Sequence, residues 1–240
     1  MSDNAMPEYN DCDRVIEEQA RDVARAWVFA GGEFSTEHLP VFAPGAHDRI
    51  ICVDRGLEHC LAAGLEPSLL IGDFDSVDEK TLNQSRLADI PRHVYPASKA
   101  ASDLELALQL LAEESLSEVN ILGVSGGRTD HMLFNWSLPA LRQWPFRLVL
   151  LDGTTCCHVL QGRDECQLET RRGQTLSLLA KARSTGVTTQ GLRYALEDAT
   201  LEIGSTLGLS NEIDGEQVRV SISSGTLLVL INRDSAFIED

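Results

Sequence analysis

Short apolar runs alternate with helix-like segments over residues 23–152. Each of five runs stops at a glycine or an aspartate, and residues 56–63 between two of them have a helical pattern. Buried strands that alternate with helices are typical of βαβ units, so we predict an α/β fold with a mostly parallel, Rossmann-like sheet and helices on both of its faces. The runs are residues 26–30, 49–53, 68–71, 119–122 and 147–151.

Two further helices are predicted in the same region. The clearer one begins after Ser102, because apolar residues recur at helical spacing over residues 104–111. Ser102 followed three residues later by Glu105 has the pattern of a capping box. The other helix follows Thr129, and Pro139 should kink or end it.

The pattern changes after Gly153. Strand-like pieces separated by glycine-containing turns predict an antiparallel β module, which we expect to be a sandwich. The pieces are residues 158–160, 175–179, 186–189, 217–222 and 226–231. We therefore expect a variable leader at residues 1–22, an α/β domain at 23–152 and a β-sandwich domain at 153–240.

Composition narrows the classes of partner. The formal net charge of −17 and pI of about 4.7 argue against binding to nucleic acid, which requires a basic surface. No apolar segment approaches the roughly 20 residues of a membrane span, and the polar N-terminus does not resemble a signal or transit peptide. Six cysteines without a Cys-x-x-Cys pair indicate reduced thiols rather than a zinc site. We expect a cytoplasmic protein with no membrane partner.

The most informative segment is Gly72-Asp73-Phe74-Asp75-Ser76. A buried run ends there in two carboxylates separated by one residue. The carboxyl edge of a parallel sheet is where ligands collect, and two acids so close together favour a hard cation such as Mg²⁺ between them. An isolated Asp-x-Asp is equally typical of a polar turn, so the neighbouring motifs decide between the two interpretations.

Other polar residues follow the same strands or begin helices. Asp54 ends the second run, and Asp103 lies at the start of a helix, where it could instead only complement the helix dipole. The segment Gly126-Gly127-Arg128-Thr129-Asp130 joins the fourth run to the next helix. Two glycines let backbone amides approach an anion, and a guanidinium binds phosphate oxygens in a fork. Acids for a metal beside such a loop indicate phosphoryl-type transfer from a nucleotide.

These motifs resemble those of the thiamine pyrophosphokinase family, over nearly the whole chain after about residue 25. The blocks that carry the resemblance are Val53-Asp54-Arg55-Gly56, Gly72-Asp73-Phe74-Asp75-Ser76, Lys99-Ala100-Ala101-Ser102-Asp103 and Gly126-Gly127-Arg128-Thr129-Asp130-His131. In the β module, Thr189-Gln190-Gly191-Leu192-Arg193-Tyr194 and Gly208-Leu209-Ser210-Asn211-Glu212 are similar to two further family motifs.

The resemblance implies an activity and a set of site residues. The terminal pyrophosphate of ATP would move to the hydroxyethyl group of thiamine and release AMP, in a homodimer whose active sites lie at the subunit interface. Mg²⁺ would bind Asp73, Asp75 and Asp103. Ser210 and Asn211 would lie near thiamine. Phosphates and nucleotide would be held by Arg128, Gly72, Ser76, Lys99, Ser102, Gly126 and Gly127. Asp54 and Asp130 would help to position metal or substrate.

Two positions depart from the family pattern. Arg55 replaces a usual glycine, and Ala100 replaces a usual aspartate, which removes one carboxylate from the site. Two alternatives therefore stay open: a pyrophosphokinase for another alcohol such as a hydroxymethyl-pterin, and a binding protein without catalysis. The general base also stays open among Asp73, Asp75, Asp130 and activation of the alcohol by the metal alone.

Overall fold

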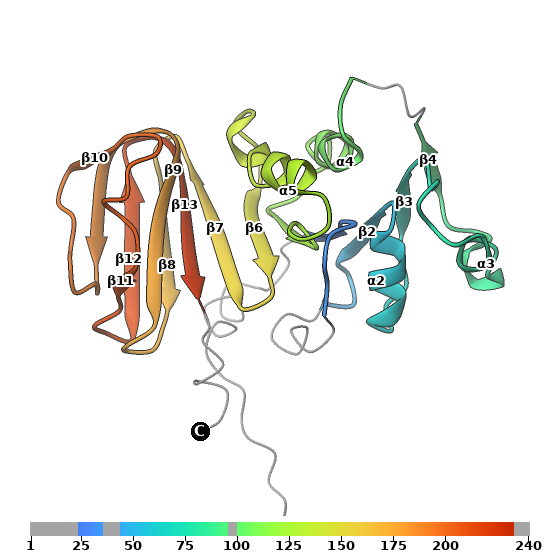
Figure 1. The fold of residues 1–240 in the computed structure, drawn as a ribbon, viewed down its shortest axis with the longest axis horizontal. Helices are drawn as coiled ribbons and strands as arrows, with labels where there is room; N and C mark the ends of the chain where they lie inside the picture. Colours follow the sequence, from blue (N-terminus) through green and yellow to red (C-terminus); the bar gives the residue numbers. More distant parts are fainter. Residues whose placement is uncertain (1–23, 36–43, 96–99, 233–240) are drawn as a thin grey trace, which may run out of the picture.

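Six parallel strands form one half of the molecule in a computed structural model that describes residues 24–35, 44–95 and 100–232 (Figure 1). All five strands that the sequence predicts for this half are present. A sixth, β4, was missed because its three residues are exposed and show no apolar pattern. In spatial order the strands are β4 (Arg92–Val94), β3 (Leu69–Gly72), β2 (Arg49–Val53), β1 (Arg25–Phe29), β5 (Glu118–Leu122) and β6 (Arg147–Asp152).

Helices cover both faces of this parallel half, as the sequence predicts. The side chains of β1 alternate between two apolar clusters, and the helices α2 (Gly56–Ala62) and α4 (Asp103–Leu111) supply residues to one cluster each. Phe29 packs in the cluster of Leu57 from α2, whereas Val28 packs in the cluster of Leu108 from α4. Strands buried on both sides explain why these runs are continuously apolar.

The predicted cap of α4 is present. The Ser102 hydroxyl accepts a hydrogen bond from the Glu105 amide at 3.2 Å. The Glu105 carboxylate accepts a hydrogen bond from the side chain of Gln109 at 2.9 Å. The other helical segments are α3 (Glu79–Leu82), η2 (Ser85–Leu87), α5 (Thr129–Asn135) and η3 (Leu138–Ala140).

Helix α5 agrees with the predicted helix in its bounds, and it lies at the surface. It starts at Thr129 as predicted and stops before the short η3 segment that contains Pro139. None of its residues is buried, and Leu133 and Phe134 are exposed. The apolar spacing therefore identified the helix but not its surroundings.

The second half is antiparallel, as predicted. Its strands surround one apolar cluster that includes Cys166, Leu178, Val220 and Val229. The strands are β7 (Thr155–Gln161), β8 (Asp164–Glu169), β9 (Thr175–Gln190), β10 (Ala199–Leu201), β11 (Asn211–Glu212), β12 (Gln217–Ile222) and β13 (Ser224–Asn232).

One difference from the sequence prediction concerns β9. Residues 175–179 and 186–189 were expected to be separate strands, but they belong to one strand of 16 residues. Gly186 has a φ of +66°, and a Cβ added at this position would lie 2.1 Å from the Ser223 hydroxyl. The glycine therefore lets β9 continue close to Ser223 and does not end the strand. Along its length β9 pairs first with β13 and then with β12.

The two halves share one continuous order of hydrogen-bonded strands. The last parallel strand, β6, pairs with β7 in antiparallel register from Leu148 to Asp152, and β7 then pairs with β13. Figure 1 shows the parallel half at one end of the long axis and β10 to β12 at the other. In the part of the chain that the structure describes, no helix is long and apolar enough to cross a bilayer.

Candidate active site

A cleft lies where the order of the parallel strands reverses. The chain builds β1 to β4 outward in one direction and then returns to place β5 on the other side of β1. In open parallel sheets the loops after two such strands diverge, and ligands bind in the crevice between them. Here the crevice has a volume of about 650 Å³ and is lined by residues 31–35 after β1, by residues after β5, and by Asp152 and Gly153 after β6.

Glycines allow the two loops to meet below this cleft. The Gly32 amide donates to the Gly123 carbonyl at 2.9 Å, and the Glu33 amide donates to the Ser125 carbonyl at 2.7 Å. A Cβ added at Gly32 would lie 2.2 Å from the Ser125 oxygen, closer than atoms tolerate. The loops after β1 and β5 are therefore held as one unit, with Gly127 on the cleft wall.

Asp54 and the Gly72–Ser76 segment are brought together at the ends of β2 and β3. Asp54 has a φ of +46°, and its Oδ1 accepts a long hydrogen bond of 3.5 Å from the Phe74 amide. A Cβ on Gly72, whose φ is +139°, would lie 1.8 Å from that same oxygen. Only glycine at position 72 leaves room for the Asp54 carboxylate, so the two sequence motifs form one structural feature.

The Asp-x-Asp pair itself forms a local turn. Asp73 Oδ1 accepts from the Asp75 amide at 3.2 Å, and Phe74 between them is buried with a φ of +58°. Burying Phe74 turns Asp73 and Asp75 away from the apolar cluster, and Asp75 is exposed. The turn interpretation and the ligand interpretation are therefore compatible, because the turn presents the two acids.

The carboxylates of Asp73, Asp75 and Asp103 are the candidate ligands for a metal ion. Asp103 begins α4, which packs against β2 and β3, but among the described residues no three His, Cys, Asp or Glu side chains lie close enough to hold a metal by themselves. Mg²⁺ in nucleotide enzymes is commonly held by one or two carboxylates together with substrate phosphates and water. Carboxylates at adjoining strand ends fit that requirement, and the assignment of Asp73, Asp75 and Asp103 stays a prediction.

The loop after β5 contains an ion pair that the sequence did not suggest. Arg128 Nε and Nη2 donate to the two carboxylate oxygens of Asp130 at 3.1 and 2.6 Å. This hydrogen bonding lowers the pKa of Asp130 to about 2 and raises the pKa of Arg128. Both side chains are exposed, so phosphate could replace the carboxylate on the guanidinium at little cost.

Two cationic or titratable side chains at the start of α2 line the cleft. Arg55 is exposed and forms a loose pair with Glu58, at 3.6 Å. The His59 Nε2 lies 2.7 Å from the Gly32 carbonyl, which means that this nitrogen carries the proton. Burial lowers the pKa of His59, and the imidazole is therefore neutral near pH 7. The sequence drew attention to Arg55 but gave no sign of His59, because its contact joins residues 27 positions apart.

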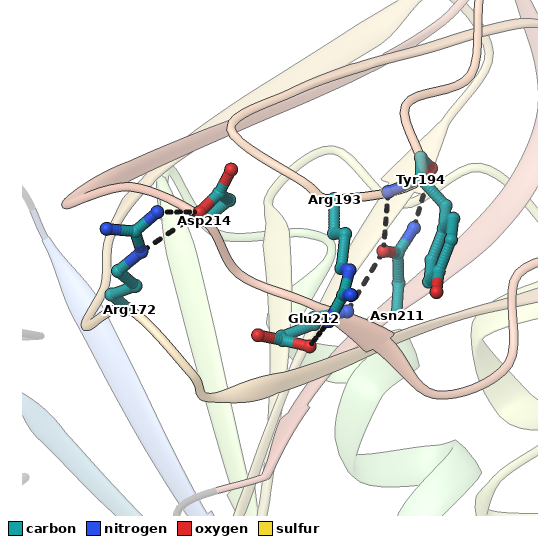
Figure 2. Close-up of polar contacts among 6 residues, drawn as sticks. All are labelled: Arg172, Arg193, Tyr194, Asn211, Glu212 and Asp214. Carbon is teal, nitrogen blue, oxygen red and sulfur yellow. Dashed lines mark hydrogen bonds and ion pairs between the residues drawn. The ribbon is translucent and has the colours of Figure 1, made fainter.

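The candidate acceptor residues lie in the antiparallel half (Figure 2). Asn211 is 8% exposed, and its side chain hydrogen-bonds to the backbone of Tyr194 and of its neighbour Glu212. Its Oδ1 accepts from the amides of Tyr194 and Glu212 at 3.1 and 2.9 Å, and its Nδ2 donates to the Tyr194 carbonyl at 2.7 Å. Asn211 thus fixes the backbone that carries the Tyr194 ring, which is 65% exposed.

Ion pairs surround this loop. Arg193 pairs with Glu212 at 2.6 Å, and its guanidinium lies 5.7 Å from the centre of the Tyr194 ring. Arg172 pairs with Asp214 at 2.5 Å, as Figure 2 also shows. Ser210 has a φ of +54°, and its amide donates to the Ser177 hydroxyl at 2.9 Å. The structure therefore gives Asn211 a structural task that the sequence motif alone did not reveal.

Comparison with known proteins matches each half to a part of one family. Residues 45–143 match the model for the thiamin pyrophosphokinase catalytic domain, and residues 162–227 match the model for the vitamin B1 binding domain of the same enzyme. The chain belongs to the thiamine pyrophosphokinase family.

Individual thiamine pyrophosphokinases agree with this result. The enzyme of Bacillus subtilis (strain 168) is 29% identical over 190 residues, which cover 78% of this chain and 89% of that protein. A crystal structure of a Bacillus subtilis thiamine pyrophosphokinase superposes with a TM-score of 0.75 at 28% identity, over 88% of this chain and 99% of that one. A thiamin pyrophosphokinase from Geobacillus thermodenitrificans gives 0.73 at 26% identity, over 89% and 99%. These relatives confirm the predicted family and the mixed α/β fold.

Membership of the thiamine pyrophosphokinase family does not assign roles to single residues. The structure groups Asp54, Gly72, Asp73 and Asp75, and separately Gly126 to Asp130. Ser76 is exposed beside Asp75, and Ser102 caps α4. Lys99 lies outside the described residues.

Proposed function

We propose that this protein transfers the terminal pyrophosphoryl group of ATP to the hydroxyethyl group of thiamine, giving thiamine diphosphate and AMP. The observation that carries the proposal is the pair of family matches: a catalytic domain over residues 45–143 and a vitamin B1 binding domain over residues 162–227. We therefore expect the parallel half to bind ATP and the antiparallel half to bind thiamine. We assign the halves to an α/β domain at residues 23–152 and a β-sandwich domain at 153–240.

The parallel half would hold the nucleotide. Its cleft lies at the switch point between β1 and β5 and is lined by Gly127, and phosphate oxygens would accept hydrogen bonds from the amides of Gly126 and Gly127. Arg128 would exchange its Asp130 partner for phosphate, which leaves the Asp130 carboxylate for metal or substrate. Asp54, Gly72, Ser76, Lys99 and Ser102 would shape or contact the rest of the site.

Asp73, Asp75 and Asp103 would hold Mg²⁺ together with the phosphates. A divalent cation supplies neutralisation of the charge that develops during phosphoryl transfer and lowers the pKa of a coordinated alcohol. The buried Phe74 side chain fixes the turn between Asp73 and Asp75. The two carboxylates would therefore lie at the end of β3, where the metal is expected. The proton of the thiamine hydroxyl would be accepted by Asp73, Asp75 or Asp130, or the metal would activate the hydroxyl without a protein base.

The antiparallel half would bind thiamine. Ser210 and Asn211 would lie beside it, with Asn211 acting mainly through the loop that presents Tyr194. An exposed aromatic face is a suitable contact for a cationic heterocycle such as the thiazolium ring. The Arg193 guanidinium lies over the Tyr194 ring and pairs with the neighbouring Glu212 carboxylate.

A homodimer would bring the two halves of the site together. Figure 1 shows β11, which contains Asn211, at the opposite end of the molecule from β2 and β3. A hollow of about 410 Å³ is lined by Trp136, Leu179 and Leu209, and exposed apolar residues occur nearby in the chain on α5 and the segment before β11. Those side chains are Leu133, Phe134, Ile203, Leu207 and Leu209. Exposed apolar side chains are frequent at protein interfaces, so we propose that the partner subunit packs there.

The thiamine match argues against another acceptor such as a hydroxymethyl-pterin, since it covers the half expected to recognise the acceptor. A binding protein without catalysis is also less well supported, because Asp54, Asp73 and Asp75 remain at the strand ends although position 100 is alanine. We further propose a cytoplasmic location, where the five described cysteines, none of which forms a disulfide, would stay reduced.

The experiment is a product analysis. Purified protein is incubated with ATP, Mg²⁺ and thiamine, and nucleotides and thiamine esters are separated by chromatography. We expect AMP and thiamine diphosphate in equal amounts, with none formed when EDTA is present. ADP with thiamine monophosphate would contradict the proposed reaction, and turnover only with a different alcohol would contradict the acceptor.

A further inference from the structure

The cleft at the switch point contains mostly acidic or uncharged groups. Glu33 and Asp152 line it, and Asp54, Asp73 and Asp75 follow neighbouring strands at the same edge of the sheet. A polyphosphate would be repelled by such an edge unless cations offset the charge. Among the described residues that line the cleft, Arg55 and His59 are the basic side chains, and the imidazole of His59 is neutral near pH 7.

Arg55 is held against the cleft by its position in the chain. It follows Asp54, whose φ of +46° turns the backbone at the end of β2. A Cβ added to Gly31 would lie 3.5 Å from the Cβ of Arg55, so the two residues are close together. The stem of Arg55 therefore runs beside the loop after β1, and the side chain lines the same cavity as Gly127 from the loop after β5. The Arg55 guanidinium can reach into the cleft without a change in the backbone.

The present partner of Arg55 holds it weakly. Arg55 Nε and Glu58 Oε2 are 3.6 Å apart, and the two side chains are 53% and 32% exposed. Exposed pairs of this kind contribute little and are easily exchanged. Glu58 is also occupied elsewhere, since its other carboxylate oxygen accepts from the Asp78 amide at 3.4 Å. Arg128 is paired more closely, because its guanidinium donates two hydrogen bonds to Asp130, at 3.1 and 2.6 Å.

We propose that Arg55 is a specificity-determining residue that contacts the phosphates of the nucleotide in this cleft and makes the site select polyphosphates over nucleosides. The inference rests on the proposed function and refines it. Arg55 forms a charge-assisted fork with phosphate oxygens after leaving Glu58, beside the amides of the glycine loops. It adds affinity for each further phosphate group and makes that affinity depend on ionic strength.

Calorimetric binding of adenosine, AMP and a non-hydrolysable ATP analogue, with Mg²⁺, tests the proposal in the full-length protein. The variants are Arg55→Gln and Arg55→Lys. The matched control is Arg183→Gln, which removes the same charge from an exposed arginine paired with Glu202 in the antiparallel half. Thermal melts of all variants establish that they are folded.

For Arg55→Gln we expect the affinity for the ATP analogue to fall by about tenfold or more, as for other lost charge-assisted bonds. Adenosine binding should not change, and the salt dependence of analogue binding should become shallower. Arg55→Lys should recover part of the loss, and Arg183→Gln should match the wild type. In turnover, KM for ATP should rise while KM for thiamine stays the same.

An Arg55→Gln protein that binds the analogue as tightly as the wild type would overturn the inference alone, provided that wild-type protein forms thiamine diphosphate. An equal loss for adenosine and for the analogue would also overturn it, because Arg55 would then act on the nucleoside or on the shape of the cleft. Wild-type protein that binds no nucleotide and forms no product would instead remove the proposed function itself.

Discussion

The carboxyl edge of the parallel half and the loop cluster of the antiparallel half use polar residues in opposite ways. At the parallel edge, carboxylates follow neighbouring strands, and two glycines make close approaches possible, Gly32 to the backbone of the loop after β5 and Gly72 to the Asp54 carboxylate. In the antiparallel cluster the polar side chains are paired with one another, as in Arg193 with Glu212 and Arg172 with Asp214.

The difference corresponds to the chemistry expected of each half. A metal and a polyphosphate need several negative and positive groups that can change partners when the ligand arrives. Recognition of an organic cation needs a rigid surface of defined shape, and Asn211 supplies that rigidity with two hydrogen bonds to the backbone of Tyr194. Substitutions in the first region should therefore affect nucleotide and metal, and those in the second should affect thiamine.

The largest effect is expected from Asp73→Asn. Asparagine keeps an oxygen that can accept from the Asp75 amide, so the turn should persist while the charge is lost. We expect turnover to fall by more than the roughly 10–100-fold typical of residues that only orient a metal ligand. The Mg²⁺ concentration needed for half-maximal rate should rise, and the melting temperature should not fall.

Asp89→Asn serves as the control for Asp73→Asn, because it removes the same charge from an exposed acid that does not line the cleft. Steady-state rates measured over a range of Mg²⁺ concentrations compare the two. Equal activity and an equal Mg²⁺ requirement in both variants would remove Asp73 from the metal site.

Gly72→Ala should damage the parallel edge through its shape. The added Cβ would meet the Asp54 carboxylate at 1.8 Å, and the φ of +139° is unfavourable for alanine. We expect a loss of at least about 1–3 kcal/mol in the free energy of unfolding, measured with denaturant, together with a strong loss of turnover. Gly64 also has a positive φ, of +73°, but no atom lies within 4 Å of a Cβ added there. Gly64→Ala should therefore lower the free energy of unfolding by less. Equal costs would mean that backbone strain, and not the Asp54 contact, sets the requirement for glycine.

Asn211→Ala should affect the other half selectively. It removes the hydrogen bonds to the partly buried backbone amide and carbonyl of Tyr194, which costs about 0.5–1.5 kcal/mol for each bond. Because the loop then loses its fixed shape, we expect KM for thiamine to rise by roughly tenfold. Initial rates with each substrate varied in turn provide the measurement. If KM for ATP rose as much as KM for thiamine, the division between the halves would be wrong.

The smallest effect concerns pH. Burial lowers the pKa of His59 below its ordinary value of 6.5, so the unfolded chain binds a proton more readily than the folded one. Stability from this residue is complete above about pH 6.5 and is lost as the pH falls toward the folded pKa. The melting temperature of wild-type protein should therefore decrease more between about pH 6.5 and 5 than that of His59→Gln. Parallel curves for the two proteins would show that His59 does not titrate in this window.

The sequence predicted the parallel half well because its information is local. Each strand is a short apolar run, and Ser102 marks a helix start by its own chemistry. The strand ends placed Asp54 and Asp73 at one edge without any knowledge of tertiary contacts. The match to a single family over both halves then supported the function that the motifs indicated.

What the sequence missed depends on contacts between distant positions. The His59 contact with Gly32, the task of Asn211 at Tyr194 and the continuity of β9 through Gly186 have no local pattern. Arg128 and Asp130 are close in sequence, but the sequence predicted a phosphate contact for the arginine and a metal or substrate contact for the aspartate. That the two side chains pair with each other is visible only in the structure. The exposed face of α5 was missed because apolar spacing predicts burial and cannot distinguish a core from an interface.

The most direct test of the division between the halves is a crystal structure with thiamine, Mg²⁺ and a non-hydrolysable ATP analogue. We predict phosphates in the cleft between Gly31 and Gly127, the metal on Asp73 and Asp75, and thiamine beside Tyr194 from a second subunit. A nucleotide bound in the antiparallel half, or thiamine and ATP held by the same half of one chain, would contradict the account.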